Sequence, residues 1–180
     1  MKFISFFAGI GGIDLGLERA GHECVGQVEI DDYCNKVLVR RFGDDTSDGH
    51  SETDGIKFPA ADLWAGGFPC QDVSHAGKRA GIEGERTGLF FEFMRLVRTV
   101  QPRYLLLENV PGILSSGHGR VQGELAEAGY HALWDMLSAA DVGALHLRKR
   151  WFCVAWRWGE EWPFADTNEQ TESALPLNDE

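Results

Sequence analysis

Strand-like and helix-like segments alternate along this chain, and the alternation limits the possible folds more than any other feature. Short apolar segments rich in β-branched and aromatic residues predict strands, and amphipathic segments that end at glycine or proline predict helices. The expected strands cover residues 2–7, 22–30, 61–67, 103–110, 130–139 and 150–158, and the expected helices cover 12–21, 31–43, 88–102 and 119–129. Strands separated by helices predict an α/β fold with a mixed, mostly parallel sheet and helices on both of its faces.

The length of 180 residues suits one domain, which we expect over residues 1–158. The polar segment 44–55 is expected to be a loop, and residues 159–180 are expected to be an acidic, disordered tail without Lys or Arg. No apolar run is long enough to cross a membrane. The four cysteines form no CxxC pair, which argues against zinc and disulfides and favours a reduced, cytoplasmic setting.

The formal net charge of −11 argues at first against a nucleic-acid partner. The distribution of charge weakens this objection, because much of the acid lies in the tail. Two basic clusters, Lys78-Arg79 with Arg86 and Arg148-Lys149-Arg150, lie elsewhere in the chain. Short clusters of this kind are most often solvated surface, so the charge pattern alone leaves both interpretations open.

A glycine-rich loop, FAGIGGIDLG, follows the first expected strand, and Glu29 ends the second. Glycines at Gly9, Gly11 and Gly12 allow a sharp turn and a close approach of the backbone to a ligand at a helix start. An acid at the end of the next strand can accept hydrogen bonds from ribose hydroxyls. The pair predicts a cofactor that contains adenosine, either a dinucleotide or S-adenosylmethionine, whereas the loop alone would be equally well explained as a plain turn.

Cys70 lies in the stretch GGFPCQDVSHAGKRAG, a loop of small, polar and basic residues after the third expected strand. Pro69 stiffens this loop, and nearby Lys78 and Arg79 favour the thiolate, so we interpret Cys70 as a nucleophile in preference to a packing residue. The other cysteines, Cys24, Cys34 and Cys153, lie in strand or helix patterns and are expected to pack inertly.

Glu108 ends the apolar strand RYLLLENV, where burial of a carboxylate is costly unless it has a function. A structural role, such as capping a neighbouring loop, explains this position nearly as well when it is taken by itself.

Taken together, these motifs resemble the DNA cytosine C5-methyltransferase family. FAGIGG is similar to the first cofactor motif of that family, VEIDDYCNKV to the second, and GGFPCQDVSHAGKRAG to its catalytic loop. LENV matches the Glu-Asn-Val motif, and HLRKRWFCVAW resembles the motif written Gln-x-Arg-x-Arg. The match extends from Phe3 to about Trp156. It implies a Rossmann-like, S-adenosylmethionine-dependent methyltransferase fold and the transfer of a methyl group to C5 of cytosine in DNA.

The resemblance also implies roles for individual residues. Cys70 would attack C6 of a flipped cytosine, Glu108 would hydrogen-bond near N3, and Arg150 would contact O2, while Arg148 is expected to steady the carboxylate or a phosphate. The residues implied for the cofactor are Phe7, Gly9, Gly11, Gly12, Glu29, Ile30, Asp54, Pro69 and Leu89, and those implied for DNA are Gln71, Ser74, Lys78 and Arg79.

The chain departs from the family pattern in two places. His146 replaces the usual Gln, and Ala144-Leu145 replaces Val-Pro. The target-recognition region and the closing C-terminal motif are expected to be absent, so a second polypeptide would supply both. The alternatives are a catalytically inactive remnant or cofactor-binding regulatory module, and an oxidoreductase that uses a dinucleotide. The last explains the glycines and Glu29 but not Cys70 with Glu108.

Overall fold

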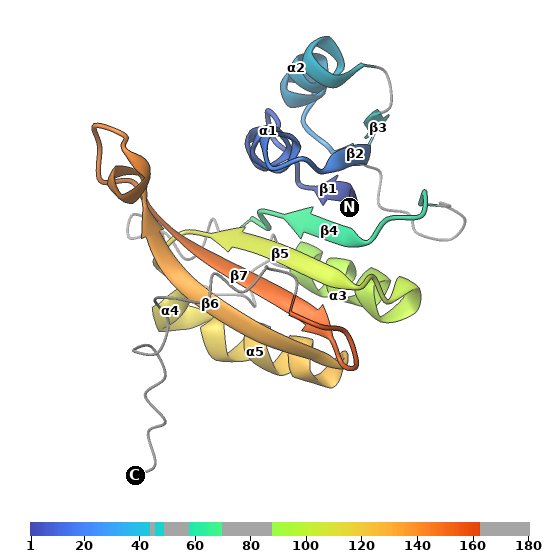
Figure 1. Cartoon of the computed structure of the whole chain (residues 1–180), viewed down its shortest axis with the longest axis vertical. Coiled ribbons are helices and arrows are strands. Elements are labelled where there is room, and N and C mark those ends of the chain that lie inside the picture. The colour runs from blue at the N-terminus through green and yellow to red at the C-terminus, as the bar shows by residue number, and fades with distance from the viewer. Residues whose placement is uncertain (44–45, 49–57, 70–87, 163–180) are drawn as a thin grey trace.

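Seven strands form one sheet in the order β3-β2-β1-β4-β5-β7-β6 (Figure 1). The computed structural model describes residues 1–43, 46–48, 58–69 and 88–162. The strands are β1 (Lys2–Phe6), β2 (Glu23–Glu29), β3 (Thr46–Asp48), β4 (Leu63–Gly66), β5 (Tyr104–Asn109), β6 (Tyr130–Ser138) and β7 (Lys149–Arg157). Strands β1 to β5 are parallel, and β7 runs antiparallel to both β5 and β6. The predicted mixed, mostly parallel sheet is therefore confirmed.

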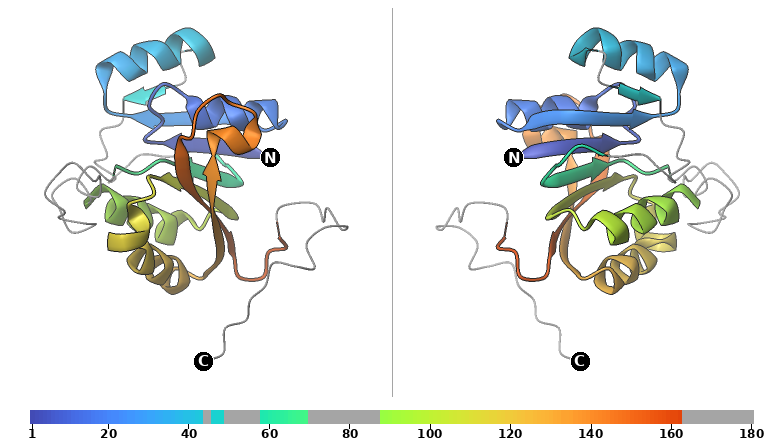
Figure 2. Two further views of the ribbon diagram at one scale, coloured as in Figure 1. Left: turned by 90° about the vertical axis from the view of Figure 1, so that its left-hand side faces the viewer. Right: turned by 90° about the vertical axis from the view of Figure 1, so that its right-hand side faces the viewer.

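Helices cover both faces of this sheet, with α1 on one side and α3 and α5 on the other (Figure 2). The helices are α1 (Gly12–Arg19), α2 (Asp32–Phe42), α3 (Gly88–Val100), α4 (Ile113–Ser116) and α5 (His118–Glu127), with a 3-10 helix η3 (Ala139–Val142). Asp31 caps α2, because its side chain accepts the Cys34 N–H at 2.8 Å. Within the described residues, no helix combines the length and the apolar character that a bilayer crossing requires.

The main core lies between α3, α4 and α5 and the sheet face that they cover. Side chains that alternate along β5 and β7 point into it and are fully buried: Leu105, Leu107, Trp151, Cys153 and Ala155. Burial of this one face fixes the pairing register of β5 and β7, because a shift by one residue would expose the whole set. The intervening residues, which include Glu108 and Arg150, consequently lie on the opposite face.

Three features differ from the sequence-based expectations or extend them. The segment 44–55, expected to be a loop, contains the short strand β3, which pairs with the end of β2 through Gln27–Glu29. Helix α4 was not expected. Trp151, near the beginning of β7, is fully buried, and Trp156 packs against a small core cluster, whereas Trp158, just after the strand, remains exposed.

Candidate active site at the carboxyl edge of the sheet

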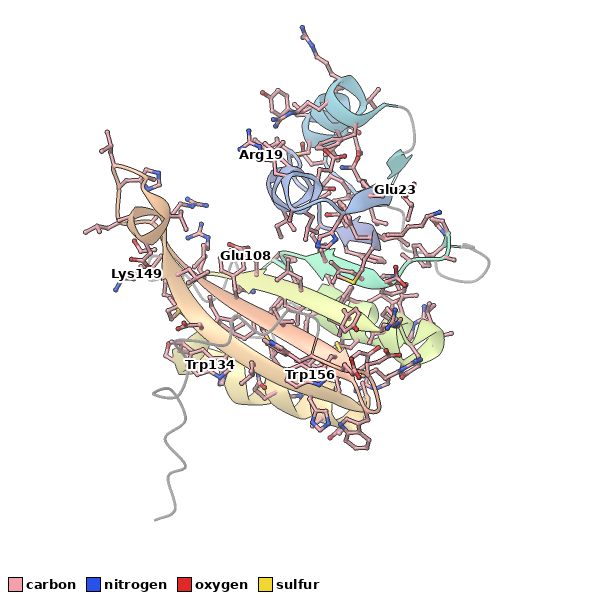
Figure 3. All side chains as sticks on the ribbon, in the orientation of Figure 1. Arg19, Glu23, Glu108, Trp134, Lys149 and Trp156 are labelled. Carbon is pink, nitrogen blue, oxygen red and sulfur yellow. The ribbon has the colours of Figure 1, made fainter. Side chains whose placement is uncertain are left out.

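The carboxyl ends of β1, β2, β4 and β5 meet at one edge of the sheet, where α/β proteins bind their ligands. The glycine loop, Glu29, Pro69 and Glu108 follow or end these four strands in turn. The antiparallel strand β7 begins at the same edge with Lys149 and brings Arg150 to it (Figure 3). The topology thus gathers the described site residues from five separate segments of the chain.

The glycine loop between β1 and α1 follows a turn that contains several left-handed residues. Phe7, Gly9 and Gly11 have φ angles of 54°, 56° and 82°. A methyl group on Gly11 would lie 2.5 Å from a ring carbon of Phe42, so both the backbone angle and the packing require glycine there. A methyl group on Gly9 or Gly12 would meet no atom of the described residues within 4 Å, so this part of the structure leaves space beside the loop for a ligand.

Glu29 ties the end of β2 to this loop. Its Oε2 accepts the Gly9 N–H at 2.7 Å, and its Oε1 accepts the N–H groups of Ile30 and Asp31 at 2.8 and 2.9 Å. Oε1 therefore uses both of its acceptor sites, whereas Oε2 has one donor among the described residues and retains one acceptor site. Ile30, beside it, leaves 71% of its surface exposed. An acid with a free acceptor site and an exposed apolar neighbour suits a ribose and its attached base.

The buried carboxylate of Asp14, which the sequence analysis did not identify, attaches the helix that follows the glycine loop to the sheet. Asp14, in the first turn of α1, is fully buried and accepts hydrogen bonds from Gln27 Nε2 at 2.6 Å and from Ser5 Oγ at 3.1 Å. These contacts join the first turn of α1, which follows the loop, to β1 and β2. The spacing of Ser5, Asp14 and Gln27 carries no motif, so only the fold brings them together.

Glu108 and Arg150 form an ion pair, with 2.6 Å between Glu108 Oε1 and Arg150 Nε. The two residues share a face because Glu108 lies opposite Phe152 on β7, two residues from Arg150. Burial raises the pKa of the Glu108 carboxyl above its ordinary value, although Arg150 and Arg148 act in the opposite direction. Arg150 is therefore the direct partner of the carboxylate, and Arg148 acts on it from a greater distance.

Asn109, the neighbour of Glu108, connects β5 to the segment that leads to Cys70. Its buried amide donates from Nδ2 to the carbonyl of Phe68 at 3.1 Å, and its Oδ1 accepts the Val110 N–H at 2.8 Å. This side chain thereby fixes the backbone two residues before Cys70 relative to Glu108. Sequence reasoning gave Asn109 only as part of a motif, without a task.

Several predicted site residues lie outside the described part of the chain. They are Cys70, Asp54, Gln71, Ser74, Lys78 and Arg79. Pro69 and Leu89, which lie on either side of residues 70–87, are both half-buried. The roles assigned to all of these residues stay predictions.

The three described cysteines are chemically unlike an activated nucleophile. Burial raises the pKa of the Cys24 thiol to about 11 and that of Cys153 to about 12. Burial and the nearby acids raise the pKa of Cys34 as well. At neutral pH all three are thiols, which agrees with the inert packing expected for them.

The comparisons with known proteins agree with this geometry. Residues 1–179 match the family described as C-5 cytosine-specific DNA methylase, and the chain belongs to this family. It is 34% identical over 161 residues to the Type II methyltransferase M.DsaV of Dactylococcopsis salina, covering 87% of this chain and 46% of that protein. It is 37% identical over 160 residues to M.NlaX of Neisseria lactamica, covering 85% of this chain and 51% of that protein.

The solved structures include that of S. pombe Dnmt2 methyltransferase, which superimposes with a TM-score of 0.70 at 21% identity. The match covers 100% of this chain and 62% of that one, and at this identity it shows the fold alone. The predicted methyltransferase fold and the predicted family are confirmed, and S-adenosylmethionine is the methyl donor of this family. The chain spans about half the length of the curated relatives it matches.

Proposed function

We propose that this chain transfers a methyl group from S-adenosylmethionine to C5 of cytosine in DNA. The observation that supports the proposal most directly is the half-buried pair of Glu108 and Arg150, at the end of β5 and beside the segment that leads to Cys70. A dinucleotide-dependent oxidoreductase would leave this carboxylate without a task, and family membership also speaks against that alternative.

The chemistry follows from the low nucleophilicity of cytosine C5. Addition of the Cys70 thiolate to C6 forms a C6–S bond and moves electrons toward C5 and N3, so C5 becomes nucleophilic. S-adenosylmethionine, when bound, would supply the methyl group that C5 takes, with cleavage of its S–CH3 bond and release of S-adenosylhomocysteine. Loss of the C5 proton to a base and of the thiolate from C6 then restores the aromatic ring. Because the target atoms lie inside the duplex stack, the base must first leave it.

In this reaction, Glu108 acts as a hydrogen-bonding acid near N3 of the cytosine. Since burial raises its pKa, the carboxyl retains its proton to higher pH than an exposed glutamate does, and it can donate to the ring nitrogen as charge collects there. Arg150, which pairs with Oε1 of this carboxyl, would contact the cytosine O2 as well.

The cofactor would occupy the edge formed by the glycine loop and Glu29. The open space beside Gly9 and Gly12 leaves room for the methionine part, and the remaining acceptor site of Glu29 suits a ribose hydroxyl. Phe7, Ile30, Pro69 and Leu89 would contribute apolar contacts around it.

A second polypeptide that recognises the target sequence stays a prediction. The formal charge of −11 repels a polyanion at long range, and a basic partner would reverse this effect. Assays of methyl transfer by the 180-residue chain, alone and with candidate partners, would decide between an independent enzyme, a partner-dependent enzyme and an inactive cofactor-binding module.

DNA that carries 5-fluorocytosine at the target tests the proposed mechanism. Fluorine at C5 cannot leave as the proton does, so the covalent adduct should persist and be visible as a complex resistant to denaturation. Cys70→Ser should abolish the complex, whereas Cys24→Ser, Cys34→Ser and Cys153→Ser should retain it. Equal trapping by the Cys70 variant would exclude this residue as the nucleophile.

A further inference from the structure

Two adjacent glycines, Gly66 and Gly67, end β4, and they differ in what surrounds them. A methyl group on Gly66 would lie 3.2 Å from the carbonyl oxygen of Phe6, so this glycine permits the close pairing of β4 with β1. Gly67 has no such backbone neighbour in the part of the chain that the structure describes, and its φ lies outside the left-handed region that favours glycine. Neither strand pairing nor backbone geometry explains why residue 67 is a glycine.

The space beside Gly67 is occupied by the carboxylate of Glu108. A methyl group on Gly67 would lie 2.9 Å from Glu108 Oε2 and 4.0 Å from its Cδ, and among the described residues it would meet no other within 4 Å. The register explains this approach, because Gly66 lies opposite Leu107 on β5 and the next residues in line are Gly67 and Glu108. A carbon atom at 2.9 Å from a carboxylate oxygen is closer than van der Waals contact allows, so any side chain here would displace the carboxylate.

The carboxylate is therefore bounded on two sides. Arg150 holds Oε1 at 2.6 Å through its Nε, and the bare backbone of Gly67 receives Oε2. We propose that Gly67 is a positioning residue, whose missing side chain sets where the Glu108 carboxylate lies relative to Arg150 and to the substrate base. The position of the carboxylate relative to the substrate base rests on the function proposed above. Displacement of a catalytic group by about 1 Å can reduce a rate ~100-fold.

The substitution Gly67→Ala tests the proposal in the full chain. Glu108 Oε2 ends a flexible side chain, so the variant is expected to fold, while the carboxylate moves away from its place beside Arg150. The matched control is Gly123→Ala in α5, where a methyl group meets no atom within 4 Å and φ is ordinary. NMR signals of the Arg150 Nε–H group and of the Glu108 carboxyl carbon should shift in Gly67→Ala and stay unchanged in Gly123→Ala. Unchanged signals in Gly67→Ala would overturn the proposal.

Methyl transfer provides the second measurement. Gly67→Ala should lower the rate by at least ~10-fold and move its pH profile, while Gly123→Ala should do neither. In a Glu108→Ala background, Gly67→Ala should cause no additional loss, because the carboxylate that it displaces has been removed. An additional loss of similar size would show that Gly67 acts through another residue. If the wild-type chain transfers no methyl group, the proposed function fails, and the NMR signals still decide whether Gly67 positions Glu108.

The double variant also settles the case in which Gly67→Ala does not fold. Folding of Gly67→Ala/Glu108→Ala together with unfolding of the single variant would confirm the clash with the carboxylate. Unfolding of both would overturn the proposal, because residue 67 would then need to be glycine for a reason unrelated to Glu108.

Discussion

At the scale of single residues, the site is organised by carboxylates whose partners are mainly backbone amides or one arginine. Glu29 accepts from three amides, so it orders the glycine loop whether or not a ligand is present. Glu108 has one arginine partner and stays partly desolvated. These two glutamates occupy similar positions, each at the end of a parallel strand, but their surroundings differ, and we propose a binding role for the first and an acid-base role for the second.

Glu29→Ala is expected to weaken S-adenosylmethionine binding by roughly 1.5–3 kcal/mol, because hydrogen bonds between a charged acceptor and the ribose hydroxyls are lost. Glu23 provides a matched control, since it begins the strand that Glu29 ends and lies at the opposite edge of the sheet (Figure 3). Calorimetry should show unchanged binding for Glu23→Ala, and NAD should not compete. Binding of NAD without binding of S-adenosylmethionine would contradict the assignment of the cofactor site.

Glu108→Gln is expected to change the free energy of unfolding in a way that depends on pH. Because the pKa of Glu108 is raised, the folded chain binds the proton more tightly than the unfolded chain. The wild-type chain thus loses stability as pH rises from the ordinary carboxyl pKa to the raised one, and Gln does not titrate. Urea unfolding of both proteins should show that the variant gains stability relative to wild type over this range. A difference that is constant with pH would contradict the raised pKa.

At the scale of secondary-structure elements, the glycine loop depends on the attachment of α1 to the sheet. Asp14→Ala removes the acceptor that Gln27 and Ser5 share in a fully buried position, so we expect a loss of about 2–3 kcal/mol in the free energy of unfolding. Glu18→Ala, on an exposed position of the same helix, should change it by less than ~0.5 kcal/mol. Equal effects of the two substitutions in urea unfolding would show that the Asp14 contacts do not hold α1 in place.

The elements that the sequence predicts are those whose side chains carry a long apolar pattern. Helix α3 was expected over 88–102 and is found at Gly88–Val100, because five of its side chains are buried on one face. Strand β3 was missed because it has three residues and is defined by its backbone pairing with β2. The antiparallel direction of β7 was not predicted either, since an apolar strand pattern is the same in both directions.

Within the site, local motifs identified Glu29 and Glu108, whose neighbours in sequence are informative. The contacts of Glu108 with Arg150 and with Gly67 follow instead from the registers of β5 with β7 and of β4 with β5, which apolar patterns do not specify. For the same reason, Asp14 and Asn109 had no assigned task before the structure joined them to Gln27 and Phe68.

At the scale of the whole molecule, charge is distributed unevenly. The chain carries a formal charge of −11, yet exposed Arg148 and Lys149 lie where β7 begins, at the edge that holds Glu108 (Figure 3). At the opposite edge, Arg103 and Arg157 both form ion pairs with Glu160, and Arg103 also pairs with Asp62, so the two positive charges there are balanced by two negative ones. Local positive charge at the carboxyl edge of the sheet can attract a phosphate at short range, even though the net charge of the whole chain repels DNA at long range.

Arg148→Ala is therefore expected to reduce the salt dependence of DNA binding as well as the affinity. A side chain that neutralises one phosphate releases its counterion, so its loss should reduce the slope of log K against log salt concentration by ~0.9 in magnitude. Arg19→Ala is the matched control, because Arg19 is an exposed arginine at the end of α1, four residues before β2 begins at the amino edge of the sheet. Fluorescence anisotropy of a labelled duplex, titrated at several salt concentrations, measures both slopes. An unchanged slope for Arg148→Ala, or an equal change for Arg19→Ala, would show that DNA does not approach the edge where β7 begins.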